Sequence, residues 1–586
     1  MNKRVLQIFS IVMALALVLT GCAAPAAPAT GGEVAAPAEQ AAPGDLPRNE
    51  TLYVAGLQWG PFITFNPLAA QITWPNSETM LIYEALFGYN VATGEIDPLL
   101  AESLTMADDT TMEITLHEGT TWQDGVPLTT EDVIFTYELG KTFTDLDIST
   151  FWDYVTEMTA VDERTLQIKL NPDRLNVGQV KHFLTRTSPV VPKHIWEERA
   201  SGDTSVSQFV EENPIGSGPY QVLDYSTERV ALVRFDDYWG KDLFGLPAPK
   251  YIVHPIFDSN DAGNLAFQQG RVDLSQQFAP QIWQMWEDQG LPVGTWFKEP
   301  PYHLPGNIPM LHINIQKPGL DNVLVRKALA YSINYAQIAE TAMSRYSDPA
   351  QPSLIIPSGG EGALFNAEQV AELGWEYNPE EAVRILEEDL GATKGNDGIY
   401  VLPDGTRLGP WKVIACYGWT DWMTAVELVA QNAQEVGIDI TTEFPEAPVA
   451  TARRNAGDFD MIIWTFTGAS PASPWARFRD ALDIRGVPPM GEVAFWNWNR
   501  FEHPDVPALL DQVAASSDLE EQKALYSELD KIYIENIPTI PLMYRPLEFY
   551  EYNESVWTGF ANADNPVAPP QQNYGGIRGY FVIQPK

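Results

Sequence analysis

Residues 411–442 carry the pattern that most limits how this chain can fold: a strand, a helix and a second strand in succession. The segment 411–417 is short and largely apolar, as a buried strand is. Residues 425–436 then have apolar residues at helical spacing, and residues 438–442 return to a strand pattern. Two strands joined by a helix lie parallel in one sheet, because the helix carries the chain back to the starting edge. The pattern therefore predicts a parallel sheet in the C-terminal half.

Other segments alternate polar and apolar residues, as strands with one buried face do. Hairpins made from such strands are antiparallel, so the sheets of the whole chain are expected to be mixed. We predict an α/β fold on this basis. Further strands are predicted at residues 51–55, 111–116, 164–170, 230–235 and 458–464, and helices at residues 78–86, 322–343 and 379–390.

The N-terminus is typical of an export signal. Lys3 and Arg4 precede an apolar run of 16 residues, which is short of the roughly 20 needed to span a bilayer. The next residues, Leu19-Thr20-Gly21-Cys22, resemble the lipobox of bacterial lipoproteins, which is cut before the cysteine. We expect residues 1–21 to be removed and Cys22 to be lipidated; the alternative is an uncleaved anchor with an incidental cysteine.

Residues 22–50 are predicted to tether the folded body to this lipid. Residues 23–44 contain ten Ala, four Pro and three Gly, and such a composition cannot build a core. We therefore expect a disordered tether and an extracytoplasmic protein, either lipid-anchored to the cell membrane or periplasmic. The lipid would be its only contact with the membrane.

Composition excludes several classes of function. The chain has 586 residues, and 36 basic against 78 acidic residues give a net charge of −42. Binding to nucleic acid depends on cationic contacts with phosphate, so no nucleic-acid partner is expected. Two cysteines exclude a disulfide framework and argue against a cysteine-based metal site. We expect a monomer of about three domains.

The sequence lacks recognisable catalytic and cofactor motifs. There is no Gly-x-Ser-x-Gly, Gly-x-Gly-x-x-Gly or His-Glu-x-x-His pattern. The Asp-Gly pairs at 397–398 and 404–405 fit hairpin turns better than a calcium loop. Cys416 lies in an apolar segment and is predicted to be inert core. We predict no catalytic residue, cofactor or metal, although 78 carboxylates leave a secreted glycosidase open by chance pairing.

Several motifs in order resemble one protein family, the family 5 extracellular solute-binding proteins of ABC importers, which bind peptides, nickel or oligosaccharides. The resemblance runs from about residue 51 to the C-terminus and is strongest to the thermophile cellobiose-type binding proteins. The motifs are Leu100-Ala-Glu-Ser-Leu, Trp122-Gln-Asp-Gly-Val-Pro-Leu-Thr-Thr-Glu-Asp-Val, Asn213-Pro-Ile-Gly-Ser-Gly-Pro-Tyr220, Val325-Arg-Lys-Ala-Leu-Ala-Tyr-Ser-Ile-Asn334, Tyr377-Asn-Pro-Glu-Glu-Ala-Val and Ile537-Pro-Thr-Ile-Pro-Leu, with Val191-Pro-Lys-His-Ile-Trp196, residues 301–305 and residues 417–423 carrying the nearer likeness.

The resemblance implies a two-lobed clamp of the periplasmic-binding-protein type, with mixed sheets and an extra N-terminal subdomain. The lobes would close over a solute and present it to a membrane permease and its ATPase. Hinge strands would lie near residues 311–315 and 541–545. The implied parts are lobe I (51–100, 215–310 and 545–586), the extra subdomain (100–215) and lobe II (311–544).

The ligand's charge class is suggested by Thr467. Peptide binders of this family commonly have Trp, then Asp three residues later and Pro after seven, and the Asp pairs with the ligand's amino group. Here Trp464 and Pro471 keep that spacing, but Thr467 replaces the acid. A buried ammonium without a carboxylate partner is costly, so a neutral, hydroxyl-rich ligand fits better.

Aromatic residues are the predicted contacts for such a ligand. An indole can stack on a sugar ring, and Trp419 and Trp422 follow a strand end, where ligands bind in α/β sheets. Asp421 between them could accept sugar hydroxyls or cap the helix. The predicted ligand-binding residues are Trp59, Trp74, Tyr302, Tyr417, Trp419, Trp422, Trp464, Thr467 and Trp475.

We therefore expect a cello-oligosaccharide-like ligand, with an oligopeptide as the alternative. Nickel-like or opine-like ligands, and a sensory binding protein without a permease, also stay open.

Overall fold

The computed structural model describes residues 46–586 except Trp59, residues 70–73, residues 76–78, Ser188, Asp203, Asp258 and Tyr574. The chain divides after Leu46, and all the helices and strands named below belong to the unit Pro47–Lys586. The predicted signal peptide, Cys22, nearly all of the tether and Trp59 lie outside the described residues.

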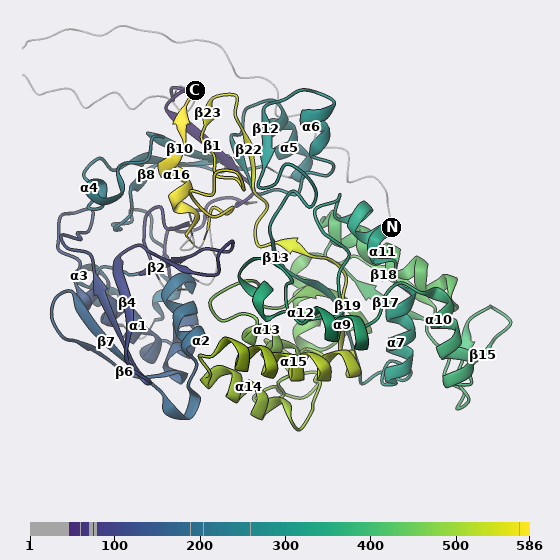
Figure 1. The fold of residues 1–586 in the computed structure, drawn as a ribbon. Helices are drawn as coiled ribbons and strands as arrows, with labels where there is room; N and C mark the ends of the chain where they lie inside the picture. The colour runs from purple at the N-terminus through teal and green to yellow at the C-terminus, as the bar shows by residue number, and fades with distance from the viewer. Residues whose placement is uncertain are drawn as a thin grey trace, which may run out of the picture. The chain divides into compact units, whose positions relative to one another are not determined.

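A seven-stranded mixed sheet gathers strands from three separate parts of the chain (Figure 1). The first strand, β1, is buried along almost its whole length and pairs in parallel with β10 and β11 on its two sides. A strand covered on both faces needs apolar residues throughout, which explains Leu52, Val54 and Ala55. In spatial order the strands are β12 (Val293–Thr295), β22 (Glu551–Asn553), β11 (Leu274–Ser275), β1 (Thr51–Ala55), β10 (Tyr251–Pro255), β9 (Arg229–Arg234) and β8 (Tyr220–Tyr225).

A four-stranded antiparallel sheet is formed entirely by residues 101–170. Alternate residues of β5 and β7 are buried, so the alternation in the sequence correctly predicts which face meets the core. Helix α1 (Thr130–Thr142) follows β5 and begins with a reciprocal cap between Thr129 and Asp132. The strand order is β4 (Ala101–Asp108), β5 (Thr111–Leu116), β7 (Thr165–Leu170) and β6 (Val155–Ala160).

A five-stranded sheet contains the predicted strand–helix–strand unit, and this prediction is confirmed. Strand β17 pairs in parallel with β18, and α11 connects them. On its other side β17 pairs in parallel with β19, whereas β14 runs antiparallel to both β19 and β20. The order is β18 (Ile440–Glu443), β17 (Trp411–Ile414), β19 (Met461–Thr465), β14 (Pro309–Ile313) and β20 (Thr539–Pro541), with α11 at Thr420–Glu435.

The strands of the three sheets fall in lobe I, the extra subdomain and lobe II as these were predicted, except that β14 of the five-stranded sheet begins two residues before the predicted start of lobe II. The parts also touch, because one buried apolar cluster includes the five-stranded sheet and residues 278–304. The Tyr346 hydroxyl donates to the Ala279 carbonyl and accepts from the Ile282 N–H at 3.0 Å. The division into lobes that move stays a prediction.

Further helices cover the five-stranded part, and short ribbons connect the segments. The helices are α7 (Val323–Ser332), α9 (Ala367–Leu373), α10 (Pro379–Arg384), α12 (Ala447–Ala456), α13 (Trp475–Leu482), α14 (Val506–Ala515) and α15 (Leu519–Asn536). The ribbons are β2 (Phe87–Tyr89) with β3 (Ile96–Pro98), β13 (Pro305–Asn307) with β21 (Arg545–Pro546), β15 (Thr393–Lys394) with β16 (Tyr400–Val401), and β23 (Trp557–Thr558) with β24 (Gln584–Pro585).

The helix predicted at residues 78–86 is wrong. Its first residue lies outside the described part, and residues 80–86 form no helix. The backbone here is used by a distant segment: the carbonyl of Ile82 accepts from the Gly218 N–H at 2.7 Å, and that of Leu81 accepts from the Tyr220 N–H at 3.0 Å. Tertiary hydrogen bonds therefore override the helical spacing of this short segment.

The helix predicted at residues 322–343 is interrupted. Helix α7 ends at Ser332, and Asn334 caps a new short helix whose last turns are π-helical. The predicted helix at 379–390 likewise becomes π-helical from Ile385 to Asp389. The Asp-Gly turns are confirmed: Gly398 joins β15 to β16, and Gly405 lies in a turn closed by the bridge between Val401 and Arg407.

Candidate ligand-binding site

Three predicted tryptophans come together where two parallel strands end. Trp419 directly precedes α11, Trp422 lies in its first turn, and Trp464 lies near the end of β19. The ring centroids are 4.7 Å apart for Trp419–Trp422, and 5.6 Å for both Trp419–Trp464 and Trp422–Trp464. Trp422 is 5% exposed, whereas Trp419 is 39% exposed. One indole therefore presents a free surface on a support of two others.

A cation and further aromatic rings support Trp464. The Arg454 guanidinium lies 4.1 Å from the centre of the Trp464 ring and 4.2 Å from that of Trp498. Trp498 stacks on Phe466 at 5.4 Å, and His312 packs against both rings. Burial lowers the pKa of Arg454 to about 10 and that of His312 to about 3, so at neutral pH the first is charged and the second neutral.

Tyr417 and Asp421 flank this aromatic group. Tyr417 is 62% exposed, on a loop where Gly418 has a φ of +83°. Asp421 does not cap α11; instead its Oδ2 accepts from Arg545 Nε at 3.1 Å. This ion pair ties the first turn of α11 to β21, so Asp421 has a structural partner that its sequence position did not indicate.

Thr467 lies on the loop after β19, where its partner is a carboxylate. Its hydroxyl and its N–H both donate to Asp480 Oδ2, at 2.7 and 3.2 Å. The other oxygen, Oδ1, accepts from Arg479 Nε and Nη2 at 2.9 and 2.6 Å. A carboxylate thus lies beside the threonine, and it is already neutralised by a guanidinium.

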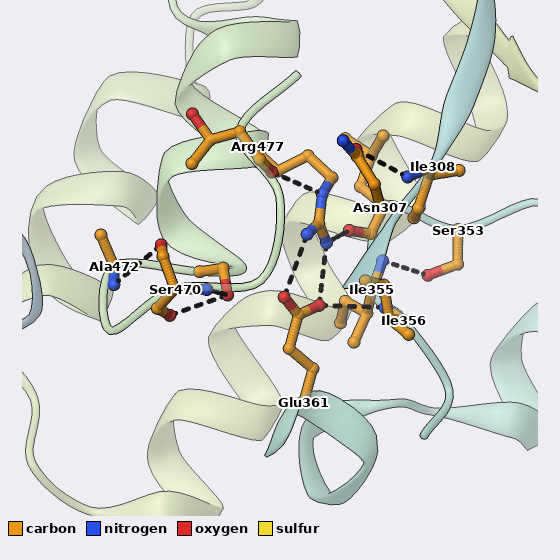
Figure 2. A network of polar contacts seen from close by, with 12 residues as sticks. Asn307, Ile308, Ser353, Ile355, Ile356, Glu361, Ser470, Ala472 and Arg477 are labelled. Atoms are coloured by element: carbon orange, nitrogen blue, oxygen red, sulfur yellow. Dashed lines mark hydrogen bonds and ion pairs between the residues drawn. The ribbon is translucent and has the colours of Figure 1, made fainter. Parts of the chain in front are cut away.

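A buried ion pair holds this loop from behind (Figure 2). Arg477 Nη1 and Nη2 donate to the two oxygens of Glu361 at 2.8 and 3.0 Å, and Arg477 Nε donates to the Thr467 carbonyl at 3.1 Å. The Ile356 N–H also donates to Glu361, at 3.0 Å. Arg477 is fully buried, so it fixes the Thr467 carbonyl from the core side, while the Thr467 hydroxyl bonds Asp480.

The other predicted contacts are buried elsewhere and have partners in the core. Trp475 Nε1 donates to the Leu510 carbonyl at 3.0 Å. Tyr302 stacks on Trp283 with a centroid distance of 5.7 Å, and Trp74 is fully buried beside His254. Among the described residues, no ring contact joins these three to the tryptophan group; their role in ligand binding stays a prediction.

A cavity of about 500 Å³ lies in another part of the described chain. Prolines, valines and Phe581 line most of it, and its cation, Arg578, stacks 3.5 Å from the centre of the Phe244 ring and donates to the Pro98 carbonyl. Its polar groups are therefore few and already engaged. The tryptophan group offers an open stacking surface beside polar side chains, so we place the candidate site there.

Sequence reasoning missed the charged residues of this site. Arg454 belongs to α12, and Asp480 follows Thr467 by 13 positions. The 13 positions between Thr467 and Asp480 correspond to no helical or strand repeat, and Arg454 belongs to a different element from the Trp464 ring that it covers. No local pattern could therefore have paired these residues. A single weak signal was the alternation of Arg and aromatic residues at the start of α13.

The family profile described as "Bacterial extracellular solute-binding proteins, family 5 Middle" matches residues 95–480. The chain belongs to this family. A family 5 protein is a non-enzymatic component of transport, so this solute-binding protein is the substrate-binding protein of an ABC importer. The expected absence of catalysis and the α/β fold are thereby confirmed.

Solved structures of an oligopeptide ABC transporter's periplasmic oligopeptide-binding protein from Thermotoga maritima resemble this solute-binding protein along most of its length. They are 32% identical in sequence and cover 92% of this chain and 100% of their own, with TM-scores of 0.84 and, for the form described as mannohexaose-bound, 0.81. Among curated relatives, the probable peptide-binding protein YejA of Agrobacterium fabrum is 27% identical over 536 residues, covering 84% of each chain.

In the described part of this solute-binding protein, no helix is both long and apolar enough to cross a membrane. Within the same residues, His, Cys, Asp and Glu side chains nowhere gather in groups of three or more that could hold a metal ion. Cys416 is buried after β17, and burial raises the pKa of its thiol to about 11, which makes it a poor nucleophile.

Proposed function

We propose that this protein captures a neutral oligosaccharide, of the cello-oligosaccharide class, and delivers it to a membrane permease driven by its ATPase. The observation that carries the proposal is the exposed face of Trp419, supported at a steep angle by Trp422 and flanked by Trp464. A rigid indole with one free face suits the apolar face of a sugar ring, and with aromatic pairs as the guide each such contact contributes about 0.5–1.5 kcal/mol.

The polar groups on the loop after β19 and on α13 support a neutral ligand. The Thr467 side chain is only partly buried, and the neighbouring Asp480 is compensated by Arg479. An oligosaccharide brings no charge that such a site would have to neutralise. The mannohexaose bound to the Thermotoga maritima relative shows that a protein with 32% sequence identity accepts a sugar polymer.

A second candidate ligand is an oligopeptide. It is favoured by the description of the Agrobacterium fabrum relative as a probable peptide-binding protein, and of the Thermotoga maritima relative as an oligopeptide-binding protein. A peptide would need another partner for its ammonium, since Asp480 is already engaged.

Calorimetry with the mature protein separates the two candidates. Mannohexaose and cellohexaose are titrated in parallel with unmodified and N-acetylated pentapeptides. Micromolar binding of a hexaose, with no binding of the peptides, supports the proposal. Micromolar binding of the unmodified peptides alone would overturn it, and acetylation would then show whether a carboxylate of the protein holds the amine.

Two further features of the proposal concern motion and anchoring. Closure of the lobes about residues 311–315 and 541–545 should reduce the radius of gyration on ligand binding, which small-angle scattering measures; an unchanged profile at saturation would contradict a clamp. Lipidation of Cys22 should place the protein in the membrane fraction, and Cys22→Ser should release it. Wild-type protein found free of lipid in the medium would contradict the anchor.

A further inference from the structure

The carboxylate of Asp480 has no capacity left for a ligand. Oδ1 accepts two hydrogen bonds from Arg479, and Oδ2 accepts the N–H and the hydroxyl of Thr467, at distances between 2.6 and 3.2 Å. A carboxylate has about four lone-pair positions, so these four bonds use all of them. Because its side chain is still 10% exposed, Asp480 is reachable but saturated.

The same bonds decide what Thr467 can offer. Its hydroxyl donates its single hydrogen to Asp480, which leaves only oxygen lone pairs toward its exposed side. A ligand group placed there must therefore donate a hydrogen bond, as a sugar hydroxyl does. An ammonium could also donate, but its charge would meet no uncompensated carboxylate in this cluster.

Arg479 is held in place from several directions. The Tyr154 side chain lies close to it, and its guanidinium lies 5.6 Å from the centre of the Trp475 ring and 5.2 Å from that of Trp496. Burial disfavours the charged form, but the attraction of Asp480 outweighs it and raises the pKa of Arg479. The cation is thus permanent at any working pH.

We propose that Arg479 is a specificity-determining residue that blocks Asp480 and thereby makes the site reject ligands bearing a positive charge. This inference rests on the proposed function in one respect, namely that Thr467 faces the solute. It goes further in assigning the discrimination between amines and hydroxyls to one arginine. Removing the guanidinium exposes a carboxylate that can hold an ammonium.

The test compares ligands that differ only in the charge of an amine. One pair is hexameric glucosamine and its N-acetylated form; the other is a pentapeptide with a free or an acetylated N-terminus. Wild-type protein should bind the neutral member of a pair at least tenfold better. In Arg479→Gln the ratio of the affinities for the charged and the neutral member should rise by tenfold or more, as calorimetry at low salt would show.

Arg485→Gln is the matched control. Arg485 belongs to the same region and donates to Asp483 through Nε and Nη2, at 3.1 and 2.8 Å. Its partners are Asp483 and Asp511, whereas the partner of Arg479 is the carboxylate that bonds Thr467. Removal of Arg485 should leave both ligand ratios as in wild type. The double variant Arg479→Gln/Asp480→Asn should lose the shift toward amines that Arg479→Gln gains, because the exposed carboxylate is then absent.

Asp480→Asn alone guards against a folding defect in Arg479→Gln. It leaves the guanidinium uncompensated, so the site should then bind amines still more weakly than wild type does. An unchanged ratio in both folded single variants would overturn the proposal. The peptide pair reports the same ratio of affinities as the sugar pair. If peptides bind and sugars do not, the proposed oligosaccharide ligand is refuted, but the peptide pair still tests whether Arg479 makes the site reject a positive charge.

Discussion

Arg477 and Arg479 lie two positions apart on α13 and both bind a carboxylate, but they occupy opposite environments. Arg477 is fully buried and bonds Glu361, whereas the Arg479 side chain is 25% exposed and bonds Asp480. Residues two apart point to nearly opposite sides of a helix, so Arg477 holds the Thr467 carbonyl from the core side, whereas Arg479 pairs with the carboxylate that bonds the Thr467 hydroxyl. The same chemistry therefore serves folding on one side and, in our proposal, ligand choice on the other.

The largest expected effect is a loss of stability when the buried Arg477 is replaced. Arg477→Met keeps much of the side-chain volume but leaves Glu361 as an unpaired buried charge, so we expect the free energy of unfolding to fall by about 3–5 kcal/mol. Urea unfolding followed by circular dichroism measures it. The double variant Arg477→Met/Glu361→Gln should recover part of the loss, and a loss below about 1 kcal/mol for the single variant would break the comparison.

A second prediction concerns pH and the same buried network. Asp530 accepts from the Leu354 N–H at 3.0 Å, while the Leu354 carbonyl accepts from Arg477. Burial raises the pKa of Asp530 from 3.8 to about 7. The folded state therefore holds a proton that the unfolded state releases between these values, and stability should fall as pH rises from about 4 to 7, then level off.

Asp530→Asn tests this pH dependence, since an amide keeps an acceptor for the Leu354 N–H. The difference in melting temperature between variant and wild type should grow in favour of the variant from about pH 4 to 7, corresponding to a few kcal/mol. A difference that stays constant over this range would mean that Asp530 titrates normally. No comparable slope should arise from Arg479, whose charge does not change there.

A third prediction contrasts an exposed tryptophan with a buried one. Trp419→Ala should weaken ligand binding by about 2 kcal/mol and leave stability nearly unchanged, because the ring is 39% exposed. Trp475→Ala should instead lower stability by about 3–5 kcal/mol, because that ring is buried and bonded to Leu510. Melting temperature and calorimetric affinity, measured on both variants, distinguish the roles; equal losses of stability would assign Trp419 to the core.

Much of the tryptophan group could be predicted from the sequence. Trp419 and Trp422 are three positions apart at the start of a helix, which brings their rings together. Trp464 joins them because β19 runs parallel to β17, so their carboxyl ends meet at one edge of the sheet. Their spatial grouping follows from local periodicity and strand direction; their contact with a solute stays a prediction.

Contacts between distant residues were not predictable in the same way. Asp421 was expected to face a sugar or cap α11, and it pairs with Arg545, 124 positions away. The helix expected at residues 78–86 is replaced by bonds to residues 218–220. In both cases the deciding partner lies outside any window in which periodicity can be measured.

The sequence by itself determined the class of fold, the parallel strand pair and the family, because these depend on repeated local patterns and ordered motifs. Tertiary structure alone decided which carboxylate lies beside Thr467 and which arginine occupies it. The physical reason is that the energy with which a charged group attracts another charge depends on its burial and its partners. Both are set by how the loop after β19 returns to α13.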